Sequence, residues 1–352
     1  MNIKFYNYFL FFFSLFSGAQ EFEFINLFDA SKDDKIACYR IPSLVTANNG
    51  ALIAAIDERN NNCKDLKWND DINIVIRKSY DNGKTWGKIE KIIDYPIGES
   101  ASDPSIIVDK ITKEIFLFFN YMNLKIAKDI YRFMVISSKD DGESWSKPKD
   151  ITNQIIKKDW EKDFMFITSG RGIQTEDGSL LHCLVNLNKG AHVFGSKDHG
   201  KNWFLVNYAL KPGDESKIIE LSDGNWLVNS RVNSNNSRYS HLSKDKGLTW
   251  ETFKNIDLKD PGCNASILNY DNKILLFSNA YNSKKRENMT ISRSFDNGLN
   301  WNTLITINRG SSGYSTMTKI QNGDVGLLFE KDDYSKNIFV IISKDLFLKN
   351  KS

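Results

Sequence analysis

The sequence predicts an all-β protein, a six-bladed β-propeller with four-stranded antiparallel blades. The pattern Ser-x-Asp-x-Gly-x-x-Trp occurs five times without a mismatch, and strand-like apolar alternation precedes it. Sheets that repeat in this way and stand radially form a propeller, in which strand edges stay short and protected. The five copies begin at Ser79, Ser138, Ser196, Ser243 and Ser294, and a decayed sixth copy without the glycine and tryptophan begins at Ser343.

Most repeats contain the signals of two hairpins. Before the first copy, isoleucines occupy every second position from 72 to 76, as in a strand with one buried face. The aspartate and glycine of the motif suit a tight turn, because the carboxylate can accept bonds from backbone amides and glycine tolerates positive φ. The tryptophan then starts the returning strand and packs under the turn. A second turn signal lies upstream in most repeats, at Asn49-Gly50, Asp177-Gly178, Asp223-Gly224 and Asn322-Gly323.

The first nineteen residues are expected to be a signal peptide. Lys4 is their only charge, an apolar run follows at 9–16, and small residues at 17–19 suit cleavage near Ala19. The run is shorter than the ~20 residues that span a bilayer; an uncleaved membrane anchor is the alternative. No later stretch is apolar for long enough to cross a membrane. We therefore expect one propeller domain over 20–352, exported to the periplasm, the cell surface or the medium.

Charge and composition exclude several classes of function. The chain has 47 Lys and Arg against 44 Asp and Glu, so it lacks the basic surface that binds nucleic acid. It contains no phosphate-binding glycine loop, no Gly-x-Ser-x-Gly and no zinc-protease motif, and its four histidines lack ligand spacing. We expect neither a metal nor an organic cofactor. Of the four cysteines, Cys38 and Cys63 flank the first strand region and could pair, although buried free thiols would fit equally well.

Together with Tyr-Arg-Ile-Pro at 39–42, the repeated motif resembles the Asp boxes (BNR repeats) of the bacterial exo-α-sialidases, or neuraminidases, of the six-bladed propeller type. The resemblance covers essentially all of 20–352. In that family the boxes are structural turns distant from the active site, so we assign their aspartates no catalytic role. The resemblance implies a monomeric glycosidase whose substrates are sialylated glycans, glycoproteins or glycolipids.

Such a substrate makes unusual demands on its enzyme. Sialic acid carries a carboxylate on its anomeric carbon, and arginine binds a carboxylate in bidentate fashion. A carboxylate nucleophile would be repelled by that group, whereas a neutral tyrosine, deprotonated by a neighbouring glutamate as it attacks, would not. In the family, sialidases use a tyrosine nucleophile. The residues to find are therefore three arginines, a tyrosine–glutamate pair and an acid.

The first repeat supplies an arginine and the acid. Arg40, in the Tyr-Arg-Ile-Pro segment, matches the first arginine of the family's triad, although phenylalanine more often precedes it. Arg59 ends the next strand and is followed six residues later by Asp65, which matches the family's acid/base aspartate. Asp70 and Asp71 are rivals for that role, but they start the following strand. We therefore assign the general acid to Asp65 and substrate binding to Arg59.

The fourth and fifth repeats supply the rest of the triad. Glu215 and Arg231, sixteen residues apart, resemble the glutamate that activates the tyrosine and the second arginine. Glu220 is the fallback for the glutamate. Arg286 matches the third arginine, whereas Arg293 lies closer to the Asp box and is expected to face solvent.

Three further residues complete the expected site. Tyr314, in Ser-Gly-Tyr-Ser-Thr at 312–316, matches the setting of the nucleophile. Glu330 resembles the strand glutamate that orients the first arginine, and Asp103 falls where the family often has a pocket aspartate.

The resemblance thus implies a secreted, retaining exo-α-sialidase. Arg40, Arg231 and Arg286 would bind the carboxylate, an enclosed Asp65 would serve as acid and base, and Tyr314 would form the covalent intermediate. One alternative is a trans-sialidase or intramolecular trans-sialidase on the same scaffold. Another is a non-catalytic propeller that binds glycan or protein, against which the presence of the catalytic set argues.

Overall fold

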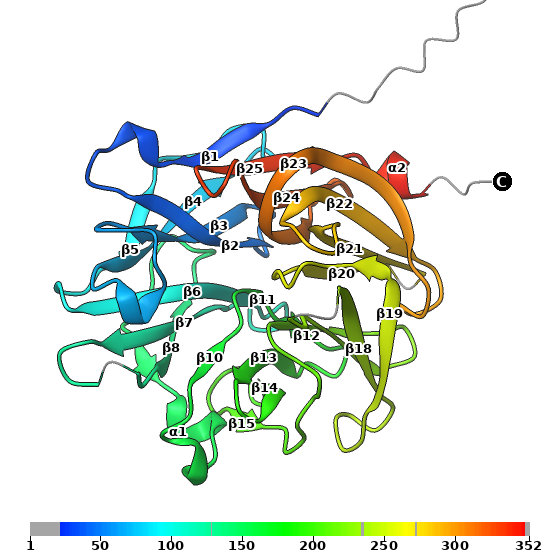
Figure 1. The fold of residues 1–352 in the computed structure, drawn as a ribbon, viewed down its shortest axis with the longest axis horizontal. Helices are drawn as coiled ribbons and strands as arrows, with labels where there is room; N and C mark the ends of the chain where they lie inside the picture. Colours follow the sequence, from blue (N-terminus) through cyan, green and yellow to red (C-terminus); the bar gives the residue numbers. More distant parts are fainter. Residues whose placement is uncertain (1–21, 128, 234–235, 272, 349–352) are drawn as a thin grey trace, which may run out of the picture.

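The protein is a ring of sheets around a central axis, as the computed structural model shows for residues 22–127, 129–233, 236–271 and 273–348 (Figure 1). The strands form five hydrogen-bonded sheets, one of which contains two blades, so the ring has six blades. The prediction of a six-bladed propeller is confirmed. The signal peptide expected at 1–19 lies outside the described residues.

Three blades have the regular order expected from the repeat, with each strand antiparallel to the next. Blade 1 consists of β2 (Cys38–Thr46), β3 (Leu52–Arg59), β4 (Ile72–Ser79) and β5 (Glu90–Ile93). Blade 2 consists of β6 (Glu99–Val108), β7 (Ile115–Asn123), β8 (Arg132–Ser138) and β9 (Lys149–Asp150). Blade 4 consists of β16 (Ser216–Glu220), β17 (Trp226–Ser230), β18 (Ser237–Ser243) and β19 (Glu251–Lys259).

Blade 3 departs from the regular pattern, because its innermost strand is broken. Both β10 (Met165–Ile167) and β12 (Ile173–Gln174) pair with β13 (Leu180–Asn186), whereas the intervening β11 (Gly170–Arg171) pairs in parallel with β6 of blade 2. Two glycines make the detour possible. Gly170 has φ +102°, and a side chain on Gly172 would meet the Leu181 carbonyl at 2.5 Å. The blade continues with β14 (Gly190–Ser196) and β15 (Phe204–Leu205).

Blades 5 and 6 share one long strand, and the N-terminal part of the chain closes the ring. The first half of β23 (Asn302–Lys319) is the outer strand of blade 5 and the second half is the inner strand of blade 6. β1 (Ile25–Asp29) pairs with β25 as the outer strand of blade 6, Ile25 opposite Phe339. Blade 5 also contains β20 (Ser266–Asp271), β21 (Ile274–Ala280) and β22 (Glu287–Ser294), and blade 6 contains β24 (Val325–Lys331) and β25 (Lys336–Ile342).

Strand direction divides the ring into two edges. Because neighbouring strands are antiparallel, the start of each first strand, the end of each second and the start of each third meet at one edge, here called the tyrosine edge. The Asp boxes follow the third strand and therefore lie at the opposite edge, here called the Asp-box edge. Each box of blades 1 to 5 connects the third strand to the fourth.

The five boxes share one hydrogen-bond pattern. The serine hydroxyl donates to the aspartate and accepts the glycine amide, and the aspartate accepts the amide and side chain of the residue four positions later. In the second box, bonds from Ser144 lower the pKa of Asp140 to about 2. The tryptophan indole donates to the glycine carbonyl in the boxes of blades 1, 4 and 5. The decayed copy at Ser343 instead leads into the short helix α2 (Lys344–Leu348).

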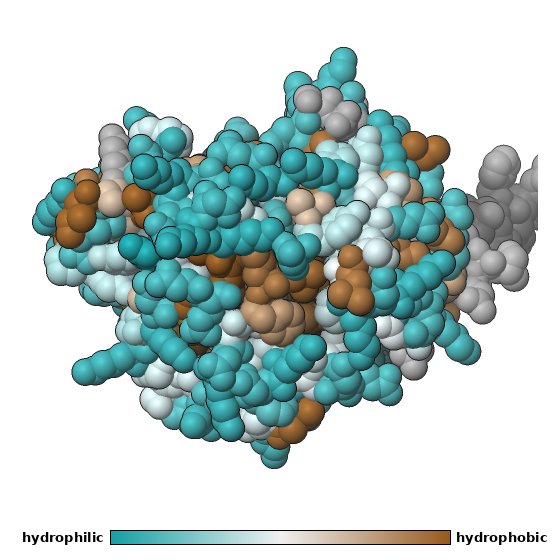
Figure 2. Space-filling view, turned by 90° about the horizontal axis from the view of Figure 1, so that it is seen from below, coloured by the Kyte–Doolittle hydropathy of each residue, from teal (hydrophilic) through white to brown (hydrophobic). Residues whose placement is uncertain are grey.

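Apolar side chains fill the spaces between neighbouring sheets. The largest cluster joins blades 2 and 3, where Phe118, Phe194 and Trp203 pack edge to face. The side of the ring in Figure 2 is mostly polar, with hydrophobic side chains showing mainly in its middle. No helix among the described residues is long and apolar enough to cross a membrane. The remaining helices are single turns: α1 (Thr152–Ile155), η1 (Ala30–Lys32), η2 (Leu66–Trp68) and η3 (Lys158–Trp160).

Candidate active site

At the tyrosine edge, three polar side chains from two parts of the ring meet. Tyr314 lies on β23, Glu215 directly precedes β16, and Arg231 directly follows β17. The Tyr314 hydroxyl donates to the Glu215 carboxylate at 2.8 Å. Arg231 donates from one nitrogen to both groups, at 2.5 Å to Glu215 and at 3.1 Å to the Tyr314 hydroxyl. The carboxylate can therefore take the phenolic proton while the guanidinium stabilises the oxygen that loses it.

The two other arginines expected from the sequence also surround Tyr314. The central guanidinium carbons of Arg286 and Arg40 lie 5.4 and 5.8 Å from the centre of its ring. Burial and the nearby charge of Glu215 raise the pKa of Tyr314 above its ordinary value, while Arg231 and Arg286 act in the opposite direction. The tyrosine is thus neutral at rest, and the arginines are placed to favour the anion once it forms.

A single buried carboxylate connects the first arginine to the tyrosine. Glu330, near the end of β24, accepts Arg40 Nε at 2.7 Å and the backbone amides of Ile41 and Tyr314 at 2.9 Å each. Its side chain is fully buried. Burial alone would raise the pKa of Glu330, but the charge of Arg40 and these bonds hold that pKa below its ordinary value. Glu330 therefore stays ionised and fixes the position of the Arg40 side chain relative to the Tyr314 backbone.

The backbone at Ile41 is strained where Arg40 enters the site. Ile41 has φ 66°, a left-handed conformation that β-branched residues rarely adopt and that costs about 1–3 kcal/mol. It lies in a bulge of β2, where pairing with β3 shifts between Arg40 and Ser43. The bulge turns the Arg40 side chain toward Glu330, whose bond to the Ile41 amide holds the conformation in place.

Tyr334 belongs to this site and was not predicted from the sequence. Its hydroxyl accepts Arg286 Nη1 at 3.1 Å, and its ring lies 3.9 Å from the guanidinium carbon of Arg40. It therefore bridges two of the three arginines, while Arg286 Nη2 donates to the Gly262 carbonyl at 3.1 Å. Tyr334 occupies the hairpin between β24 and β25 together with Asp332 and Asp333, and all three have positive φ. A tyrosine in the hairpin that follows Glu330 is the signal that could have found it.

Arg59 and Asp65, which the sequence reading placed six residues apart with separate roles, pair directly. The fully buried Arg59, at the end of β3, donates to Asp65 at 2.8 Å, to the Cys63 carbonyl at 2.9 Å and to Asp57 at 2.9 Å. The expected enclosure of Asp65 is wrong for this structure, because its side chain is 66% exposed. Asp65 occupies the N-cap position of the short helix η2, where its side chain makes no capping bond. An exposed carboxyl held by Arg59 can reach a leaving group that projects outward.

Two more aspartates lie behind Arg59. Asp57 Oδ1 accepts the Asp103 amide at 3.0 Å, and its other oxygen accepts Ser102 and Arg59. Burial raises the pKa of Asp57 to about 6, against the charge of Arg59. Burial and the charges of Asp57 and Asp65 raise the pKa of Asp103 well above its ordinary value. Asp57 and Asp103 are thus neighbours behind Arg59, joined by the Asp103 amide, and the Asp103 carboxyl accepts the Asn120 side chain at 2.9 Å.

The structure also separates the residues between which the sequence left a choice. Glu220 lies at the other end of β16 from Glu215, and Arg293 lies at the far end of β22, so neither approaches Tyr314. The expectation that Arg293 faces solvent is wrong, because Arg293 is buried and donates to the Phe347 carbonyl. The Asp71 carboxylate accepts a hydrogen bond from the Asn60 side-chain amide, and the Asp70 carboxylate accepts one from the Asn61 side-chain amide. Of the three candidate aspartates, Asp65 is the one bound to Arg59.

The loop that carries Asp65 is anchored covalently. Cys38 and Cys63 form a disulfide with Cα atoms 5.7 Å apart, whereas Cys183 and Cys263 are buried free thiols. Cys263 packs against Tyr314 and Ile41 beneath the site. Among the described residues, no group of three or more His, Cys, Asp or Glu side chains is arranged to hold a metal ion.

Sequence comparison identifies relatives over most of the chain. Residues 66–327 match the family described as a BNR repeat-like domain. The chain is 30% identical over 350 residues to a sialidase from Bacteroides fragilis, covering 89% of this chain and 64% of the relative. It is 32% identical over 327 residues to a sialidase from Micromonospora viridifaciens, covering 83% of this chain and 50% of that protein. The chain thus spans about half to two thirds of the length of these relatives.

Solved structures agree on the architecture. A Hadza microbial sialidase superimposes with a TM-score of 0.79 at 29% identity, over 89% of this chain and 67% of the other. A leech intramolecular trans-sialidase superimposes with a TM-score of 0.77 over 92% of this chain and 70% of the other, at 21% identity. At that lower identity the second likeness supports the fold alone.

Proposed function

Because the chain belongs to the BNR-repeat family of β-propellers that includes the bacterial sialidases, we propose that it is an exo-α-sialidase that removes terminal α-linked sialic acids from glycoconjugates. The observation that carries the proposal is the Tyr314 hydroxyl at 2.8 Å from Glu215 and 3.1 Å from Arg231, within a group of three arginines. A carboxylic acid sugar is the substrate for which a tyrosine nucleophile and an arginine cluster are both useful.

The arginines bind the substrate carboxylate. Arg40, Arg231 and Arg286 each keep one side anchored, to Glu330, Glu215 and the Gly262 carbonyl respectively. Their remaining donors are available to a planar anion, and guanidinium groups suit it because they stay charged and offer paired N–H bonds. Because the anchors fix the arginines before the substrate arrives, little reorganisation is needed when they bind its carboxylate.

The reaction proceeds in two displacements. In the first, the Tyr314 oxygen attacks the anomeric carbon as its proton passes to Glu215, while Asp65 protonates the departing glycosidic oxygen. In the second, Asp65 takes a proton from water, the water oxygen attacks the anomeric carbon, and the bond to Tyr314 breaks as Glu215 returns the proton. Each displacement inverts the anomeric centre, so the product retains the α configuration.

We further propose that the enzyme works outside the cytoplasm as a monomer over residues 20–352. The Cys38–Cys63 disulfide supports an oxidising compartment. Tyr314, Glu215 and the three arginines converge within a single propeller, so the proposed chemistry requires no residue from a second copy.

The proposal is tested with purified protein and a fluorogenic α-sialoside, followed by NMR of the products from sialyllactose. We expect release of the fluorophore and α-sialic acid as the first sugar to appear. Appearance of 2,7-anhydro sialic acid, or of a sialylated acceptor sugar, would assign transfer instead of hydrolysis. If the purified protein released no fluorophore and showed no Tyr314-dependent activity, the proposal that it is a sialidase would be excluded.

A further inference from the structure

A cavity of about 650 Å³ opens at the Asp-box edge of the central axis, at the opposite mouth from Tyr314. Its wall is formed where the inner strands end, so all six blades contribute to it. Glu215 and Glu220, at the two ends of β16, show the separation: five residues of strand span about 17 Å. The cavity is thus distinct from the tyrosine site.

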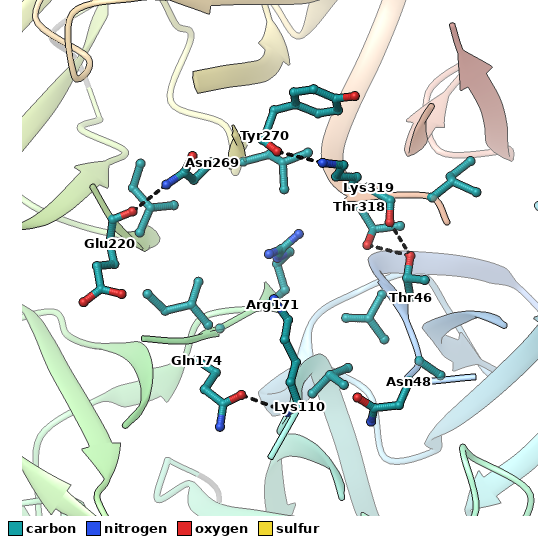
Figure 3. A pocket seen from close by; sticks show the side chains of 18 of the residues that line it. Thr46, Asn48, Lys110, Arg171, Gln174, Glu220, Asn269, Tyr270, Thr318 and Lys319 are labelled. Atoms are coloured by element: carbon teal, nitrogen blue, oxygen red, sulfur yellow. Dashed lines mark hydrogen bonds between the residues drawn. The ribbon is translucent and has the colours of Figure 1, made fainter. Parts of the chain in front are cut away.

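Three cationic side chains from three blades line this cavity: Lys110 after β6, Arg171 on β11 and Lys319 at the end of β23. In Figure 3 the Lys110 and Arg171 side chains extend into the middle of the opening. Arg171 donates to the Met317 carbonyl at 3.0 Å, and Lys319 donates to the Tyr270 carbonyl at 3.2 Å. In the part of the chain that the structure describes, none of the three forms an ion pair with a carboxylate.

The three charges repel one another. Desolvation, followed by the charges of Arg171 and Lys319, lowers the pKa of Lys110. Burial lowers the pKa of Arg171 to about 10. Holding cations together in a partly desolvated space is unfavourable unless an anion joins them.

The acidic residues of the wall are committed to other partners. Asp271 accepts the amides of Lys273 and Ile274 in its own turn. Glu220 accepts the Glu176 amide at 2.6 Å, and in Figure 3 its carboxylate lies at the side of the cavity, away from Arg171. The cations in the middle therefore lack a counter-charge close by.

Neutral hydrogen-bonding groups complete the lining. The Thr46 and Thr318 hydroxyls bond to each other, Thr46 donates to the Lys319 carbonyl at 2.7 Å, and the Gln174 side-chain oxygen accepts the Lys110 backbone amide at 2.8 Å. These groups are occupied with one another and with the backbone, so an anion in the cavity would meet chiefly the Lys110 and Arg171 cations.

We propose that this mouth of the propeller is a binding site for a divalent tetrahedral oxyanion, either free phosphate or sulfate or the corresponding group of an ester. Two negative charges balance a cluster of three cations better than one does, and four oxygens can accept bonds from several directions. The cavity is larger than a lone phosphate needs, so an organic substituent can be accommodated beside the anion.

The test measures binding of inorganic phosphate and phenyl phosphate to the purified chain by titration calorimetry, in a buffer free of other multivalent anions. We expect millimolar or tighter binding that weakens by ~tenfold or more in Lys110→Gln and in Arg171→Gln. Tighter binding of phenyl phosphate would identify an ester as the ligand, and equal binding would identify the free anion. No phosphate binding by the wild type, or acetate binding as tightly as phosphate, would overturn the proposal.

A matched variant locates the site: Lys84→Gln removes a cation from an Asp-box turn outside the cavity lining and should bind phosphate as the wild type does. Arg286→Gln removes a cation from the other mouth. Loss of phosphate binding in Arg286→Gln with no loss in Lys110→Gln would place the anion at the tyrosine site and overturn the proposal. Arg171 also holds the β23 backbone, so its variant is first checked by thermal melting. The Lys110 side chain makes no such contact with the residues that the structure describes, so the Lys110 variant decides the test if Arg171→Gln does not fold.

Discussion

The two edges of this propeller are built in opposite ways. At the Asp-box edge, one local turn is repeated five times, and each aspartate accepts a hydrogen bond from the backbone amide four positions later. At the tyrosine edge, the partners come from distant parts of the chain: Tyr314 and Glu215 are 99 residues apart, and Arg40 and Glu330 are 290 apart. Local turns tolerate replacement one at a time, whereas a converging site depends on every member.

The carboxylates of the two edges show the same difference. Bonds within its own turn lower the pKa of the exposed Asp140 to about 2. At the tyrosine edge, burial raises the pKa of Asp57 to about 6 and raises the pKa of Asp103 well above its ordinary value. Shifted acids in a pocket suit proton transfer, and fully ionised acids in exposed turns suit structure. Substitutions at the two edges should therefore separate activity from stability.

The largest effect is expected for Tyr314→Phe. The change removes the attacking oxygen and keeps the ring, so turnover of sialyllactose should fall by ~10³-fold or more, while the free energy of unfolding changes by only about 1 kcal/mol. Tyr270→Phe is the matched control, because it removes a tyrosine hydroxyl bonded to the Gly323 carbonyl at the other edge. Steady-state kinetics and thermal melting compare the two. Near-normal turnover by Tyr314→Phe would exclude this residue as the nucleophile.

Asp65→Ala should have the next largest effect, and the effect should depend on the substrate. Without its acid, the enzyme should lose ~10²–10⁴-fold in kcat/KM on natural sialosides, whose leaving groups need a proton. Aryl sialosides with good leaving groups should be nearly spared. Asp70→Ala is the control, since that rival aspartate binds Asn61 and not Arg59. An equal loss on both classes of substrate would show that Asp65 is not the general acid.

Removal of the disulfide should weaken stability and the tyrosine edge together. Replacing Cys38 and Cys63 with serine opens a loop of 25 residues, which should cost about 3 kcal/mol of unfolding free energy. The Cys63 carbonyl also accepts Arg59, so the Asp65 loop should loosen and kcat/KM should fall. Denaturant unfolding and kinetics measure the two effects. An unchanged denaturation midpoint would mean that the bond does not restrain the unfolded chain.

The smallest effect is expected for Asp140→Ala at the Asp-box edge. Melting temperature should fall by a few degrees, with kcat unchanged, because one of five turns loses its bonds to Ser138 and Ser144. The pH dependence has a definite sign. Since the folded state lowers the pKa of Asp140 from 3.8 to about 2, its contribution is complete above about pH 4 and is lost as pH falls toward 2. The variant should therefore approach the wild type in melting temperature at low pH. A selective loss of kcat would mean that this box serves the active site.

The regular part of the fold could be predicted because its signals are local. The Asp-box residues lie within eight positions of one another, and their bonds form inside a single turn. The irregular parts could not, because they depend on neighbours in space. The broken inner strand of blade 3 pairs with blade 2, and β1 closes the ring on β25 across the whole chain.

By itself, the sequence determined the number of blades and the place of most turns, because turn chemistry and strand alternation act over a few residues. The candidate residues at the tyrosine edge came from the resemblance to the sialidases. Only the tertiary structure distinguished Glu215 from Glu220 and showed that the Asp65 side chain is exposed. It also identified Tyr334 as the residue that bridges Arg40 and Arg286. The same holds for the cationic cavity around Arg171. Strand direction and the radial packing of blades bring these groups together. The distances between them and the burial of each side chain therefore cannot be predicted from the sequence of any single repeat.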